Sequence, residues 1–161
     1  MKKKSIIFIL ILSASCNERS ESVRRHSQGS TEPISSAQID SAITVANKFY
    51  DTDNYLQAVK SFSYLLSKDS TNGEYYYKRA YSYTKLLNRQ EAIQDFQQAI
   101  RLHFKSASAC FNIGINSSFD NDSLALYYFE KCVELDPSYP QAYVEIHECR
   151  ERLKKEHSGL N

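Results

Sequence analysis

A short pattern of small and large apolar residues recurs along the chain at a nearly constant interval. It consists of Ala, an aliphatic residue, two variable residues and Phe, and it begins at Ala58, Ala92 and Ala125. The second interval is shorter than the first by a single residue. Small side chains allow two helices to cross closely, and a large ring fills the wedge beside the crossing. The interval therefore predicts helical hairpins that bury their apolar faces by stacking on one another.

The composition agrees with a helical fold. Four Gly and three Pro among 161 residues supply few of the turns that a many-stranded β fold needs. A second small residue precedes each copy of the pattern, at Ala46, Ala80 and Gly114. This is expected for the helix that pairs with the one carrying the pattern. We therefore expect an all-α fold.

The period and the residue types resemble the tetratricopeptide repeat (TPR), a pair of antiparallel helices. Three copies in register cover residues 39–72, 73–106 and 107–139, and the segment CVELDP near the end of the third copy is typical of that family. Residues 140–157 read as one more helix of the first-helix type, with the polar outer face that a capping helix requires. The resemblance implies an all-α TPR solenoid at residues 36–157, followed by a short tail at 158–161.

Residues 1–15 resemble the signal peptide of a bacterial lipoprotein. Three Lys precede the apolar run SIIFILIL, which is too short to span a bilayer, and small residues then lead to Cys16. Ser13 stands where that family usually has an apolar residue. The resemblance implies that the signal is removed, that Cys16 is diacylated and that the mature chain begins there. A plain signal peptide or an uncleaved anchor is the alternative.

Residues 16–35 are polar and rich in Ser, and we expect a flexible tether with a reach of about 25 Å. Together with Cys16, this segment predicts an exported protein that is anchored to a membrane by lipid. Asn17 is not the Asp associated with inner-membrane retention, which favours the outer membrane of a Gram-negative-type envelope. Removal of the signal leaves 17 basic and 19 acidic side chains, so no global basic field is left to attract nucleic acid.

Side chains for catalysis or metal binding form no recognisable motif. The four His lie in separate segments, and no Gly-rich phosphate loop, HExxH or CxxC motif occurs. We therefore expect a protein without enzymatic activity, cofactor or metal. Cys110, Cys132 and Cys149 are interpreted first as core residues. A disulfide among them is the second interpretation, because export leads to an oxidising compartment, and a metal site with His147 is the third.

The resemblance also implies a concave groove, lined by the first helix of each repeat, that binds an extended peptide or a partner helix. The predicted groove residues are Ile43, Asn47, Tyr50, Tyr77, Tyr81, Phe111, Ile115 and Val144. Exposed Tyr and Phe supply contact area at low entropic cost, so we expect a protein–protein interaction or scaffold module. The alternative for these rings is that they pack on each other in a narrow groove.

Three further hypotheses concern the partner and the function. Family members that bind chaperone tails hold a terminal carboxylate with a clamp of Lys, Asn and Arg. Here only Asn47 matches that clamp, so a chaperone tail is not the expected partner. Self-association through exposed hairpin faces, and a redox or metal-binding role of the late cysteines, are the competing functions.

Overall fold

The computed structural model describes residues 35–159, and within this range the chain forms α-helices and no strand. The helices are α2 (Ser36–Asp51), α3 (Tyr55–Leu66), α4 (Gly73–Lys85), α5 (Arg89–Arg101), α6 (Ser106–Ser117), α7 (Asp122–Leu135) and α8 (Pro140–Ser158). The predicted signal peptide, the lipidation site Cys16 and nearly all of the predicted tether lie outside the described residues. Among the described helices, none is both long and apolar enough to cross a bilayer.

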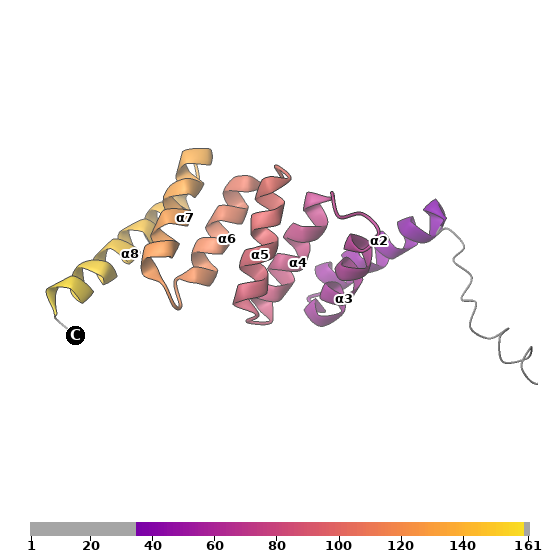
Figure 1. The fold of residues 1–161 in the computed structure, drawn as a ribbon, viewed down its shortest axis with the longest axis horizontal. Helices are drawn as coiled ribbons and strands as arrows, with labels where there is room; N and C mark the ends of the chain where they lie inside the picture. Colours follow the sequence, from indigo (N-terminus) through magenta and orange to yellow (C-terminus); the bar gives the residue numbers. More distant parts are fainter. Residues whose placement is uncertain (1–34, 160–161) are drawn as a thin grey trace, which may run out of the picture. The chain divides into compact units, whose positions relative to one another are not determined.

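The helices form a stack in which each one contacts the next along the chain (Figure 1). Helices α2 and α3, α4 and α5, and α6 and α7 form three hairpins, one in each of the three predicted repeats. Helix α8 packs on α7 at the end of the stack. The structure thus confirms the all-α solenoid of three hairpins and a final helix.

The core lies at the helix crossings, where the repeating small and large residues meet. In the first hairpin, Ala46 of α2 and Ala58 of α3 are fully buried together with Phe62. The second hairpin buries Ala80, Ala92 and Phe96 in the same way, and the third buries Gly114, Ala125 and Phe129. Each crossing therefore places a Phe ring against the small residues of its own hairpin.

The third crossing leaves no room for a Cβ atom at its first small residue. A Cβ atom added at Gly114 would lie 2.5 Å from Cε1 of Phe129, well inside van der Waals contact. The third repeat has one residue fewer between its first small residue and the motif Ala, and it is the repeat in which Gly replaces Ala.

A largely buried ion pair joins the two helices of the second hairpin, and its arginine also reaches the first hairpin. Arg79 of α4 binds Asp95 of α5 through two hydrogen bonds, Nε to Oδ2 at 2.6 Å and Nη2 to Oδ1 at 2.8 Å. Its third nitrogen, Nη1, donates to the hydroxyl of Ser63 on α3 at 2.9 Å. The planar guanidinium of Arg79 matches the carboxylate of Asp95 in two bonds, and its third bond reaches Ser63. One side chain of α4 therefore contacts both α3 and α5.

The sequence spacing predicts capping boxes at Ser35 with Gln38, Thr71 with Glu74 and Asn88 with Glu91, and it predicts Pro140 at a first helical position. The helix starts in the structure agree with these predictions only in part. Ser35 and Gln38 form the expected capping box at the start of α2, and Pro140 occupies the first turn of α8 as expected. The expected cap of α4 by Thr71 is wrong, because the side chain of Asn72 accepts the hydrogen bonds from the first turn. Asn88 is the N-cap of α5, but its side chain forms no capping bond. Asx and hydroxyl side chains one position apart offer similar caps, and sequence spacing does not separate them.

We predict that Gly114→Ala lowers the free energy of unfolding. Overpacking against the buried Phe129 ring costs about 1–3 kcal/mol, and the better helix propensity of Ala returns about 0.5–1 kcal/mol, so a net loss of about 1–2 kcal/mol is expected. Urea unfolding followed by circular dichroism measures this difference. Ser123→Ala, at an exposed position of α7, is the control that should change little; equal stability of both variants would contradict the tight crossing.

Candidate partner-binding groove

Three tyrosines from α2 and α4 form the best-defined part of the predicted groove. The ring centroid of Tyr50 lies 5.6 Å from that of Tyr81. One helical turn earlier, Tyr77 makes edge contacts with Phe96 at 5.3 Å and Phe104 at 5.7 Å. These rings are neither buried nor fully exposed, so one side of each packs on the core while another part remains open to solvent.

The next part of the groove is formed by α6. The ring of Phe111 packs between those of Phe129, at 5.6 Å, and Tyr139, at 5.0 Å. Ile115 packs on the buried cluster that contains Phe129 and Ile146. Phe111 and Ile115 thus both contribute to the core. The contacts of Phe111 with Phe129 and Tyr139 agree with the alternative interpretation, in which the rings pack on each other.

The remaining predicted residues lie in different surroundings. Ile43 packs on the core cluster of the first hairpin. Asn47 accepts a hydrogen bond at 2.7 Å from Nζ of Lys78, which also pairs with Glu74 at 2.7 Å. Val144 of α8 is 57% exposed and makes the least contribution to the core. Direct contacts therefore join the predicted groove positions of α2 and α4, whereas Val144 is mostly exposed.

Two lysines that the repeat pattern did not indicate lie over the rings of these tyrosines. The Nζ atom of Lys85 lies 5.1 Å from the ring centroid of Tyr81, and that of Lys105 lies 5.3 Å from the centroid of Tyr77. Both distances are within the range of cation–π attraction. The four-residue spacing of Tyr81 and Lys85 on one helix could have indicated the first contact. No local pattern indicates the second, because Lys105 lies far along the chain from Tyr77, beyond the end of α5.

Burial favours the protonated hydroxyls of Tyr50 and Tyr77. It is the largest cause of the raised pKa of Tyr50 and of Tyr77, and other tyrosines nearby raise both further. Both hydroxyls therefore stay protonated and neutral at physiological pH. The rings can act as apolar surfaces and as hydrogen-bond donors, but they supply no negative charge to a ligand.

The three cysteines of the described residues are free thiols buried in the core. Cys110 and Cys132 belong to one buried cluster, and burial raises the pKa of each to about 11. Cys149 lies in another cluster, where Nη2 of Arg152 donates to its Sγ at 3.1 Å and also binds Asp122. These positions agree with core packing, the first of the three interpretations. Within residues 35–159, no group of three or more metal-binding side chains occurs.

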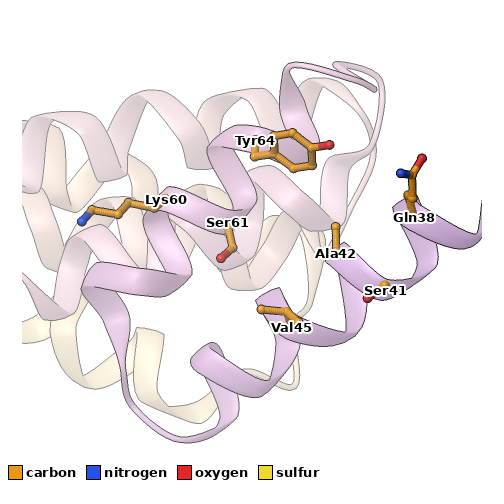
Figure 2. A pocket seen from close by; sticks show the side chains of 7 residues that line it. All are labelled: Gln38, Ser41, Ala42, Val45, Lys60, Ser61 and Tyr64. Atoms are coloured by element: carbon orange, nitrogen blue, oxygen red, sulfur yellow. The ribbon is translucent and has the colours of Figure 1, made fainter. Parts of the chain in front are cut away.

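A separate hollow of about 390 Å³ lies outside the predicted groove, between α2 and α3 (Figure 2). Its lining comes from one face of the first hairpin and consists of Gln38, Ser41, Ala42, Val45, Lys60, Ser61 and Tyr64. Val45 and Tyr64 are 44% and 43% exposed. None of the predicted groove residues lines it, so the first hairpin has a second surface that could take part in an interaction.

Comparison with known families identifies one tetratricopeptide repeat, at residues 73–105. This range coincides with the second predicted repeat and covers the α4–α5 hairpin. A comparison with curated proteins finds no match. The family match therefore rests on one repeat, and the other two are supported by the structure.

Solved TPR domains have the same fold. The second TPR domain of human RPAP3, in complex with the HSP70 peptide SGPTIEEVD, is 26% identical, with a TM-score of 0.64 over 71% of this chain and 96% of that one. The TPR domain of Arabidopsis OM64 is 22% identical, with a TM-score of 0.65 over 70% and 94%. The Yersinia enterocolitica secretion chaperone SycD, bound to a peptide of the translocator YopD, is 15% identical, with a TM-score of 0.67 over 75% and 98%. The fold is that of a TPR solenoid.

We predict that Cys110 and Cys132 react slowly with iodoacetamide in the native protein. The thiolate is the reactive form, and a pKa of about 11 instead of 9.0 reduces it roughly 100-fold near pH 8. Peptide mass spectrometry of native and urea-unfolded protein reads each cysteine separately from Cys16. The raised pKa stabilises the native state fully below about pH 9, and this contribution is lost as the pH rises through 11. Rapid native labelling, or peptides joined by a disulfide, would contradict the buried free thiols.

Proposed function

We propose that this protein is a lipid-anchored docking module of the bacterial cell envelope that binds a segment of a partner protein in the groove of its solenoid. The observation that carries the proposal is the group of half-buried rings formed by Tyr50, Tyr77 and Tyr81. The core holds these rings in place before any partner arrives, so binding costs little side-chain entropy. Aromatic side chains of this kind dominate the binding energy of protein interfaces.

The solved relatives support a peptide or protein as the partner. Human RPAP3 and Yersinia SycD have this fold and are each described in complex with a peptide. TPR solenoids typically act as interaction modules without enzymatic activity. We therefore propose a scaffold role for this chain and no catalysis.

The proposed partner is not a chaperone tail held by a carboxylate clamp. Ile43 occupies the position of the first clamp Lys and packs on the core. Lys78, which could supply a positive charge, is already paired with Glu74 and bonded to Asn47. A terminal carboxylate would have to displace these partners, so we propose that the groove binds its partner through other contacts.

We propose that Cys16 carries the lipid and that the anchor lies in the outer membrane. This rests on the signal-like residues 1–15 and on Asn17 in the following position. A polar segment of about 25 Å reach would then separate the lipid from the solenoid. The partner would accordingly be a protein of the same envelope.

A second candidate function is self-association through the first hairpin. The observation that favours it is the hollow between α2 and α3, together with the exposed apolar surface of Val45 and Tyr64 (Figure 2). In the interior of the stack the equivalent face is covered by the preceding hairpin. Sizing of the full chain in detergent, with Val45→Asp as the variant, tests this: a monomer in both cases argues against it.

We predict that Tyr81→Ala/Val144→Ala lowers capture of the partner at least about tenfold, because truncation of a hot-spot aromatic residue such as Tyr81 costs on the order of 2 kcal/mol. These two positions are chosen because Tyr77 and Phe111 also pack on core rings, so that their truncation would cost stability. The measurement is crosslinking of the full-length protein in native membranes, followed by identification of the captured proteins.

Tyr127→Ala/Leu135→Ala is the matched control for this experiment. It removes similar apolar surface from exposed positions of α7 that lie outside the groove. Thermal unfolding of all variants checks that the fold is retained. A partner that is captured equally by the groove variant and the wild type would place the interface elsewhere, and capture of other copies of the chain alone would support self-association.

We predict that Cys16→Ser abolishes labelling of the protein by a radioactive fatty acid, because Cys16 is the proposed site of acylation. Asn17→Ala is the control and should remain labelled. Equal labelling of Cys16→Ser and the wild type would contradict a lipid on Cys16. A wild-type protein that takes up no fatty acid would favour a plain signal peptide or an uncleaved anchor.

A further inference from the structure

The positive charges of the groove are concentrated at α4. Lys85 and Lys105 lie over the rings of Tyr81 and Tyr77, near the two ends of this tyrosine pair. Among the described residues, neither lysine forms a salt bridge with an acidic side chain. Asp51 of α2 holds the position that Lys85 holds in α4, one repeat later, so the positive region does not extend to α2.

Negative charges occupy the groove positions of α8. Glu145 has the repeat position that Asn112 holds in α6 and that Lys78 holds in α4. At that position, Lys78 bonds across the groove to Asn47 of the preceding first helix. Glu148 follows almost one turn later on α8. The register therefore places both carboxylates of α8 on the side that faces the groove.

The carboxylates of α8 are poorly compensated by their neighbours. Glu148 lies 3.8 Å from Nη1 of Arg152, a long distance for an ion pair, and Arg152 is engaged with Asp122. No salt bridge involving Glu145 is found in residues 35–159. Burial, and secondarily the charge of Glu148, raise the pKa of Glu145. Two neighbouring like charges, one of them on a half-buried side chain, are unfavourable for the free protein, and a cation from a partner would relieve this.

Beyond Lys105 at its N-cap, helix α6 separates the two charged regions with a neutral surface. Its groove positions carry Ser108, Phe111, Asn112 and Ile115. The groove is therefore positive at α4, neutral and partly aromatic at α6, and negative at α8. Such an arrangement discriminates between partners and between binding directions, because like charges placed opposite each other cost several kcal/mol.

We infer that the partner segment is an extended dipolar peptide, with acidic residues that lie over α4 and basic residues that lie against α8. This inference rests on the proposed function, since it specifies the ligand of the same groove. Neighbouring packed helices are about 8–10 Å apart, so α4 and α8 are roughly 20 Å apart across α6. An extended chain rises about 3.3 Å per residue, so about six residues separate the two charged groups of the ligand. The acidic residues are internal side chains, and a free carboxyl terminus is not required.

The test is selection of random peptides of about 12 residues, which span roughly 40 Å when extended. The peptides are fused to a phage coat protein through their C-termini, so that none has a free terminal carboxylate. The full chain is the bait, as wild type, as Lys85→Glu/Lys105→Glu and as Glu145→Lys/Glu148→Lys. Arg101→Glu and Glu156→Lys, at exposed positions outside the groove and outside the hollow of the first hairpin, are the matched controls.

The expected wild-type pool contains an acidic and a basic group separated by about six residues. Peptides from this pool should bind each groove charge variant at least about tenfold more weakly and bind the controls as they bind the wild type. The lysine variant should select peptides without the acidic group, and the glutamate variant should select peptides without the basic group. High salt should weaken wild-type binding.

Other results separate the failure of this inference from the failure of the proposed function. Selected peptides that lack a charge pattern but lose affinity for Tyr81→Ala/Val144→Ala would overturn the dipolar ligand and leave the groove as the docking site. Selected peptides that bind this groove variant normally, or a selection that yields no binding peptide, would overturn both.

Discussion

The close approach of a small residue and a phenylalanine ring at each helix crossing is the constraint on which the rest of the structure depends. Ala46, Ala80 and Gly114 leave room for Phe62, Phe96 and Phe129, and these contacts set how near the two helices of each hairpin can lie. That distance determines where the first helix presents its outer face. Because the same crossing is repeated three times, the outer faces of α2, α4 and α6 fall in register, as the predicted groove requires.

The groove is an extension of this packing. Tyr50 and Tyr77 contact the crossing rings Phe62 and Phe96 with one edge, while another part of each tyrosine remains accessible. The same contacts that stabilise the hairpins therefore orient the surface offered to a partner. This dual use explains why the rings pack on each other and still keep accessible aromatic surface. It also explains why substitutions in the groove must be separated into those that alter binding and those that alter the core.

The fold could be predicted because helical packing is encoded in the spacing of small and large residues, and this spacing repeats three times. Each predicted repeat contains one hairpin, although α2 begins at Ser36, before the predicted start of the first repeat at residue 39, and the predicted final helix is α8. Details that depend on side chains from distant segments could not be predicted in the same way. Asp95 approaches Arg79 from the following helix, and Lys105 approaches Tyr77 from beyond the end of α5. The capping of α4 by Asn72 could not be predicted for a local reason, because the adjacent residues Thr71 and Asn72 both have side chains that can cap a helix.

The first hairpin has a buried cluster of its own, whereas the cluster around Phe96 also includes Ala109 and Ile113 of α6. Each hairpin contacts only its neighbours in the stack. In such an assembly the stability of a hairpin is the sum of its own packing and its interfaces, and an end hairpin has one interface fewer. The α2–α3 hairpin is the first end of this stack, and Arg79 binds Ser63 there as one of its links to the second hairpin. Local unfolding of this hairpin would remove Asn47 and Tyr50 from the groove but leave Tyr77, Tyr81 and Phe111 in place. The solenoid can thus lose one end of its binding surface by fraying, without global unfolding, and hydrogen exchange would register this end as the first to open.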